Sequence, residues 1–242
     1  MQHMRRPVLP LPVLGLALSA VAAAAVPAAV SAQATPDNRP GFAVFHFAYG
    51  GSFGTGAEDL TQFAVGIQQI LMTELAQNTN LRVVDRARLR EYMAEVDLGS
   101  RVDPATAARI GRIVGAKYAL SGGFVEINGE MRIDGHIVDV ETTEVIKGQE
   151  IRGRRNDIFD VLVDFASLVS RDVNLPELPE QVREARKSRN LNGEAARLYS
   201  AALSAADSGE TTRAIELYRQ IASRFPEFED AKRELRQLES GI

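Results

Sequence analysis

Hydrophobic and polar positions along the first folded stretch predict a strand, a helix and a second strand. Residues 41–47 are rich in aromatic and branched side chains, which is typical of a strand. Apolar residues then recur at helical spacing over 59–78, with Asp59 available as an N-cap, and 81–84 form a second short apolar run. We interpret the glycine-rich stretch 48–58 as a flexible connecting loop.

Two helices follow the second strand. Residues 87–96 are predicted as a charged helix. Its inward-facing side chains are expected to be Leu89, Tyr92, Met93 and Val96. The next helix has the clearest limits in the chain, because Asp103 is a capping residue, Pro104 suits the first helical position, and Gly115 ends the helix.

The following strands are joined by hairpins instead of helices. Residues 117–127 form a strand that ends at Asn128-Gly129, and this dipeptide favours a type I′ turn because both central positions need a positive φ. A second hairpin is expected at 141–144, with its returning strand over 145–154.

This change of connection predicts an α/β (α+β) fold, in which a mixed β-sheet is packed against helices. The strongly apolar helix expected over 158–173 closes the core. The α/β domain therefore covers residues 35–174, and residues 175–191 form a proline-bounded linker and a helix.

Residues 192–242 are predicted to be a small all-helical segment. Tyr218, Ala214 and Gly209 precede Pro226 by 8, 12 and 17 residues, which matches a tetratricopeptide-like helix pair. A plain helical hairpin with chance matches is the alternative. Since one repeat does not form an independent solenoid, the segment must dock on the first domain, on another subunit or on a partner.

The amino terminus is predicted to be an export signal over residues 1–34. Arg5 and Arg6 precede an apolar run over 13–26, and Ala32 and Ala34 form a small-x-small cleavage pattern. An uncleaved membrane anchor is the alternative, but this run is shorter than the roughly 20 residues needed to span a bilayer. We therefore expect a soluble protein of an exported compartment, the periplasm.

Composition narrows the classes of function further. Hydrophobic residues make up 45% of the chain and charged residues 25%, as in ordinary globular proteins. The formal net charge is −4, and it falls to −6 when Arg5 and Arg6 are removed, so the basic footprint of a nucleic-acid-binding protein is absent. The absence of cysteine excludes disulfides, thiolate metal sites and a cysteine nucleophile.

A serine-hydrolase motif occurs at residues 50–54, which fit G-x-S-x-G around Ser52. His136 and Asp103 could supply a base and an acid. However, a nucleophile elbow turns directly into its helix, whereas residues 55–58 intervene here. The hydrolase is a remote alternative.

Phosphate-binding and metal-binding patterns are incomplete. Gly51 and Gly56 have P-loop spacing, but Ala57-Glu58 stands where Lys-Ser/Thr is required. A dinucleotide fingerprint would lack its third glycine, although Asp85 lies where a ribose-binding acid is expected. His46 and His136 lie on separate strands without a cysteine or a clustered carboxylate loop. We expect no cofactor, no metal and no enzyme activity.

Several local elements resemble the CsgG family of curli assembly/transport components. They comprise Val83-Val84-Asp85-Arg86 with Leu89, the stretch from Ala107 through Gly111, Gly115 and Tyr118 to Gly122, and the hairpin Val138-Asp139-Val140 with Thr142, Glu144 and Val145. The resemblance covers residues 41–151. Thr143 stands where the family usually has glycine in that hairpin. The amino-terminal domain of TolB and the penicillin-binding-protein activator LpoB resemble the family at the level of the fold.

The resemblance implies an exported α/β domain that works by association with envelope or outer-membrane proteins or with itself. Channel members of the family are lipoproteins anchored by an amino-terminal cysteine, so the cysteine-free sequence predicts no lipid anchor. A pore-forming secretion-channel subunit and an activator of a peptidoglycan enzyme are the alternatives within the family. For partner binding by the helical segment, the candidates are Arg213, Tyr218 and Arg219, with packing inside the helix pair as the alternative role of Tyr218.

Overall fold

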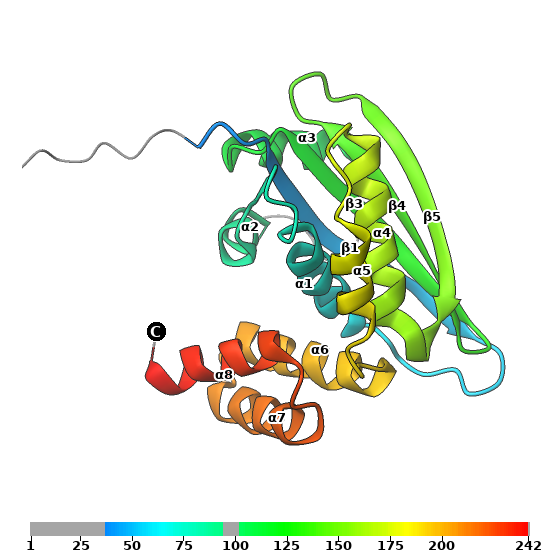
Figure 1. The fold of residues 1–242 in the computed structure, drawn as a ribbon, viewed down its shortest axis with the longest axis vertical. Helices are drawn as coiled ribbons and strands as arrows, with labels where there is room; N and C mark the ends of the chain where they lie inside the picture. Colours follow the sequence, from blue (N-terminus) through cyan, green and yellow to red (C-terminus); the bar gives the residue numbers. More distant parts are fainter. Residues whose placement is uncertain (1–36, 94–101, 242) are drawn as a thin grey trace, which may run out of the picture. The chain divides into compact units, whose positions relative to one another are not determined.

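A five-stranded mixed β-sheet lies at the centre of the structure, a computed structural model that describes residues 37–93 and 102–241 (Figure 1). The strand order is β2-β1-β3-β4-β5. β2 and β3 run parallel to β1, whereas β3, β4 and β5 are antiparallel neighbours. The strands are β1 (Gly41–Phe53), β2 (Arg82–Val83), β3 (Tyr118–Ile127), β4 (Glu130–Asp139) and β5 (Val145–Arg154). The predicted mixed sheet is confirmed.

Helices cover the two faces of this sheet. They are α1 (Phe63–Leu75), α2 (Arg86–Met93), α3 (Pro104–Ile113), α4 (Ile158–Asp172), α5 (Glu180–Lys187), α6 (Gly193–Asp207), α7 (Thr211–Arg224) and α8 (Glu229–Ser240). Successive residues of β1 alternate between the faces, so Phe42 and Val44 pack with α1 and α4, while Ala43 and Phe45 pack with α2 and α3. We call the two sides the α1/α4 face and the α2/α3 face.

β1 is longer than predicted and includes half of the expected loop. It continues to Phe53, which lies opposite Ile127 of β3. The register shifts between Tyr49 and Ser52, where Gly51 takes a φ of +114°. Because glycine adopts this backbone conformation without a steric penalty, the strand passes through the irregularity and keeps its pairing with β3. The loop itself begins only at Gly54.

The start of α1 and one side chain of α2 also differ from the prediction. Asp59 is not the N-cap of α1: its carboxylate accepts hydrogen bonds from the Thr61 amide and hydroxyl, and the helix begins at Phe63. The Asp59 carboxylate is used in this local turn, so it does not cap the helix. Tyr92 is 37% exposed instead of buried, and Val96 lies outside the described residues.

The predicted caps and turns around β3 are confirmed. Asp103 accepts a hydrogen bond of 3.0 Å from the Thr106 amide at the start of α3. Asn128 and Gly129 have φ values of 52° and 81°, as a type I′ turn requires. In the second hairpin Thr143 occupies the left-handed region with a φ of 65°.

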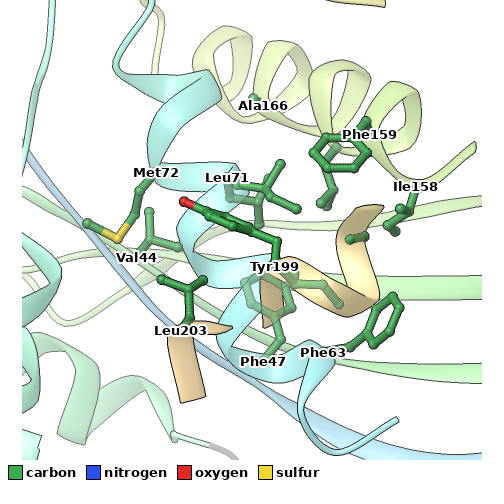
Figure 2. Close-up of a cluster of buried hydrophobic side chains, with 14 of the residues drawn as sticks. Val44, Phe47, Phe63, Leu71, Met72, Ile158, Phe159, Ala166, Tyr199 and Leu203 are labelled. Carbon is green, nitrogen blue, oxygen red and sulfur yellow. The ribbon is translucent and has the colours of Figure 1, made fainter. Parts of the chain in front are cut away.

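The carboxy-terminal helices pack onto the α/β domain, so the first of the three docking alternatives is the one observed. The described residues from Asn38 onwards form one compact unit. Figure 2 shows Tyr199 and Leu203 of α6 beside Leu71 of α1 and Phe159 of α4. A single apolar core therefore joins the sheet, α1, α4 and the predicted repeat.

Charged side chains connect the same elements. Glu74 of α1 is 1% exposed and accepts hydrogen bonds from Arg186 of α5, at 2.6 and 2.8 Å, and from Arg189, at 2.8 Å. The hydrogen bond from Arg186 is bidentate, which fixes the orientation of both groups. On the other side, Arg86 and Arg90 of α2 pair with Asp207 at the end of α6.

Within residues 37–93 and 102–241, none of the helices has both the length and the apolar character needed to cross a membrane. The predicted signal residues, including Ala32 and Ala34, lie outside the described part of the chain.

Candidate functional site

The predicted contact residues of the helical segment lie in different environments. Arg213 and Arg219 of α7 are exposed and pair with Glu210 at 3.0 Å and Glu239 at 2.7 Å. Tyr218 is 1% exposed and packs with the ring of Tyr199, as in the alternative that places it inside the helix pair. Burial raises the pKa of the Tyr218 hydroxyl, because the low-dielectric core penalises its charged form.

The inward side of α6 is covered by the α/β domain. At their crossing, Gly66 of α1 approaches Ser200 of α6. Ala195, Leu198, Ala202 and Leu203 of α6 belong to the common core. This side of α6 is therefore not open to a partner in the folded chain.

The hydrolase candidates are not brought together. The Ser52 hydroxyl donates a hydrogen bond of 3.0 Å to the buried carboxylate of Glu126. His136 lies opposite Ser121 in the β3–β4 register, five residues from Glu126, which corresponds to about 17 Å along the strand. The odd number of residues also places His136 on the opposite face of the sheet. Ser52 and His136 therefore do not form a nucleophile–base pair.

The two acids of the rejected motifs have local structural roles. Asp103 caps α3, and its hydrogen bonds from Thr106 lower the pKa of its carboxyl group. Asp85 accepts hydrogen bonds from the amides of Ala87 and Arg88 at the start of α2, at 2.8 and 3.2 Å. Neither carboxylate is therefore available for its motif, in which Asp103 would be a catalytic acid and Asp85 a ribose ligand.

The glycine-rich segment is held by neighbouring side chains. The Thr55 amide donates to Asn128 Oδ1 at 3.0 Å, and Glu58 lies 3.2 Å from the guanidinium of Arg155. Arg155 also approaches the carboxylate of Glu126, at 3.4 Å. Since Glu58 and Glu126 both pair with Arg155, this guanidinium is already neutralised and the segment does not form a phosphate cradle around it. Across the described residues no group of three potential ligands could hold a metal ion.

Two large apolar side chains are exposed side by side at the end of the sheet. Phe53 of β1 is 55% exposed and Ile127 of β3 is 53% exposed, and the two residues are register partners. They lie on the α2/α3 face, opposite to Ser52 and Glu126. We call Phe53, Ile127 and the adjoining Asn128 the hairpin tip. Adjacent exposed apolar side chains form a small patch of the kind that another molecule can cover.

Hollows flank the hairpin tip on both sides. One of about 400 Å³ is lined by Val125, Ile127, Asn128, Glu130, Arg132 and Arg152. The other, of about 590 Å³, has Asn128, Glu130, Arg155 and Arg197 among its lining residues. The two hollows share Asn128 and Glu130. The tip therefore offers apolar contact area next to spaces that admit a partner's side chains.

A row of paired charges continues from the hairpin tip across β4 and β5. Arg132 Nη2 lies 2.8 Å from both Asp134 and Glu150, and Arg152 Nε lies 2.7 Å from Glu150. The hydrogen bonds from Arg132 to Asp134 raise the pKa of its guanidinium. These side chains lie on the α2/α3 face beyond the helices, where they remain in contact with water.

Sequence reasoning missed the hairpin tip because Phe53 was assigned to a loop. The available signal was Ile127, a large apolar residue immediately before an Asn-Gly turn. With β1 extended to Phe53, pairing with Ile127 follows from the parallel register.

Comparison with known families confirms the resemblance drawn from the sequence. Residues 23–136 match the family model of the curli production assembly/transport component CsgG. No match was found among curated proteins.

Among solved structures, the LpoB carboxy-terminal domain from Salmonella enterica is similar, with 18% identity over 48% of this chain and 82% of that chain and a TM-score of 0.39. The PelC dodecamer from Paraburkholderia phytofirmans has 15% identity over 56% and 89%, with a TM-score of 0.35. Lipoprotein GNA1162 from Neisseria meningitidis has 15% identity over 55% and 94%, with a TM-score of 0.37.

Proposed function

We propose that this CsgG-type chain is an exported protein of the cell envelope that acts by binding other envelope proteins. Its role lies in the assembly, secretion or anchoring of cell-surface material, and it acts without catalysis. The match of residues 23–136 to an assembly/transport family supports this class of function. The observation that carries the proposal in the structure is the exposed pair Phe53 and Ile127 at the hairpin tip.

The hairpin tip suits binding because its apolar side chains have no cover of their own. Complete burial of a large apolar side chain stabilises by about 1.5–3 kcal/mol, and Phe53 and Ile127 each retain about half of their surface for a partner to cover. Aromatic side chains at the centre of an interface commonly dominate its binding energy. Phe53 is therefore the expected anchor.

The hairpin tip is also held in one conformation before binding. Asn128 lies in the type I′ turn and accepts a hydrogen bond from Thr55, so the turn is tied to the end of β1. Phe53 and Ile127 project from paired strands instead of loops. Binding therefore costs little free energy for ordering this surface.

The test is a comparison of variants in cells that express the full chain. Phe53→Ser with Ile127→Ser removes the apolar pair, while Tyr92→Ser with Ile113→Ser removes two exposed apolar residues on α2 and α3. After crosslinking in the native envelope and purification, we expect the first double variant to lose co-purified envelope proteins and the control to retain them. Identical sets of proteins would contradict binding through the hairpin tip.

The captured proteins and the shape of the purified particles distinguish the roles within this class. A peptidoglycan synthase among them would favour an activator, whereas ring-shaped particles with a detergent belt would favour a secretion-channel subunit. Labelling of Ser52 by a fluorophosphonate probe, lost in Ser52→Ala, would contradict a non-enzymatic function.

A further inference from the structure

β5 is the outermost strand of the sheet, and β4 is its one strand partner within the described residues. Figure 1 shows its outer edge running along the side of the molecule with no helix beyond it. Every second residue from Val145 to Arg154 is exposed, and the others are exposed or half-buried. The strand therefore presents an uncovered row of backbone donors and acceptors.

The alternation of the ladder shows which backbone groups point outward. The Arg155 amide donates to the Gly129 carbonyl at 2.9 Å, so Arg155 and the odd-numbered residues before it are directed towards β4. The backbone groups of Gly148, Glu150, Arg152 and Arg154 are then directed away from the sheet. The regular part of the edge ends near Lys147, because the register shifts beyond it.

Side chains along this edge alternate in the same way. Glu150 and Arg152 lie on the α2/α3 face, where they pair with each other and with Arg132. Ile151 lies on the α1/α4 face, packed against the core, opposite Ile133 of β4. Glu150 and Arg152 thus lie on one face of β5, and the apolar Ile151 between them lies on the other face.

We propose that a second copy of this chain pairs with β5 in antiparallel orientation, about a two-fold axis at Ile151. Glu150 of each copy then lies opposite Arg152 of the other, and the two Ile151 side chains meet on the axis. The two sheets become continuous across the β5 edges. Arg152 also lines the hollow beside Ile127, but the strand pairing needs none of Phe53, Ile127 and Asn128, so the proposal does not depend on the proposed function.

The charges select this register among the alternatives. A shift by two residues in one direction would place Glu150 opposite Glu150, and a shift in the other direction would place Arg152 opposite Arg152. Like charges directly opposite each other destabilise a strand pair. A shift by one residue would exchange the faces, bringing Ile151 to the charged side. Of these registers, pairing centred on Ile151 is the one that places opposite charges across the axis and keeps the faces matched.

The first test uses the natural absence of cysteine in the chain. At the axis, the two Ile151 residues form a non-hydrogen-bonded pair, whose Cα atoms lie about 4.5 Å apart. This separation is within the range of a disulfide. We expect Ile151→Cys in the full chain to give a covalent dimer on mild oxidation. Gln149→Cys is the matched control, because Gln149 lies opposite Gly153 of the other copy and should remain monomeric.

The second test exchanges the charges and measures the dimer dissociation constant by sedimentation equilibrium. Glu150→Arg and Arg152→Glu should each weaken association by about tenfold, because each places two like-charge pairs across the axis. The double exchange restores opposite charges and should recover the wild-type constant. Circular dichroism melting of each variant separates lost association from lost folding.

The outcomes decide the proposal in either direction. Selective crosslinking through residue 151, together with recovery in the double exchange, supports the dimer. A wild-type chain that stays monomeric at every concentration, or crosslinking that is equal for residues 149 and 151, overturns it. Pairing of β5 with a different protein would appear as a heterodimer lost in the same single variants, and it also overturns the proposal.

Discussion

Gly66 of α1 and Ser200 of α6 meet where the two helices cross, and a Cβ atom on Gly66 would lie 1.9 Å from Ser200 Oγ. The Ser200 hydroxyl is itself directed to the Ala196 carbonyl, at 2.7 Å. This contact sets how closely the carboxy-terminal helices approach the α/β domain. It is absent from any single-helix pattern in the sequence, because it depends on two residues 134 positions apart.

Gly66→Ala is expected to separate the two helices. The added methyl group overpacks the crossing and should lower the free energy of unfolding by about 1–3 kcal/mol, measured by urea denaturation. Ser200→Gly removes the clashing side chain, so the double variant should lose less stability than the sum of the single changes. Strict additivity would show that the crossing is not this close.

Glu74→Gln should destabilise the protein by about 3 kcal/mol, because it removes the buried carboxylate that pairs with Arg186 and Arg189 and leaves Arg186 only the more distant Asp230, at 3.9 Å. Burial opposes the charge of Arg186, but the hydrogen bonds to Glu74 raise its pKa overall. The matched control is Glu239→Gln, which breaks the exposed pair with Arg219 and should cost no more than about 1 kcal/mol. Equal losses in chemical denaturation would argue against a special role for Glu74.

Thr143→Gly should stabilise the protein by about 0.5–1 kcal/mol. A branched residue in the left-handed region is strained, and glycine relieves that strain at some cost in unfolded-state entropy. Thr142→Gly is the control. Thr142 Oγ1 accepts a hydrogen bond from the Glu144 amide, so its removal should lower stability. Melting temperatures that fall in both variants would refute strain at residue 143.

Glu234→Gln should stabilise the protein at neutral pH and have no effect near pH 3. Burial raises the pKa of the Glu234 carboxyl, because the charged form is desolvated against α6 and α7. The folded state thus holds this proton more tightly, and stability falls as the pH rises from the unfolded pKa through the folded one. Melting temperatures of the wild type and Glu234→Gln, measured between pH 3 and 7, check that the gain in stability grows as the pH rises.

Glu229 provides a comparison of opposite sign. The hydrogen bond from Lys232 lowers the pKa of its carboxyl group. Its contribution to stability is therefore present above the unfolded pKa and lost as the pH falls through the folded pKa. Glu229→Gln should lower the melting temperature slightly at neutral pH, and a gain there would contradict this assignment.

Local signals predicted those parts of the fold that depend on neighbouring residues. The Asn128-Gly129 turn and the Asp103 cap need specific residues within a few positions, so the sequence contains the whole interaction. The mixed sheet followed from the change between helical and hairpin connections. The predicted limits of β3 and β5 were correct to within one residue, whereas β1 extends six residues beyond its prediction.

Features that depend on distant residues could not be predicted in this way. Apolar spacing identified the inward side of α6, but it does not name the surface that α6 packs against. Glu74 is a charge within an apolar stripe, and its partner Arg186 lies 112 residues further on. Exposure of Phe53 and Ile127 likewise depends on where α2 and α3 stop covering the sheet. The candidate site was therefore missed.

The shared core also determines when the protein can finish folding. Tyr199, Leu203 and Phe228 complete a core that begins with residues of β1 and α1. Synthesis delivers the amino-terminal residues first, so the apolar side of α1 stays uncovered until α6 to α8 arrive. A chain cut after α5 would keep this surface exposed, which makes it prone to aggregation and open to proteases, so only uncut molecules accumulate.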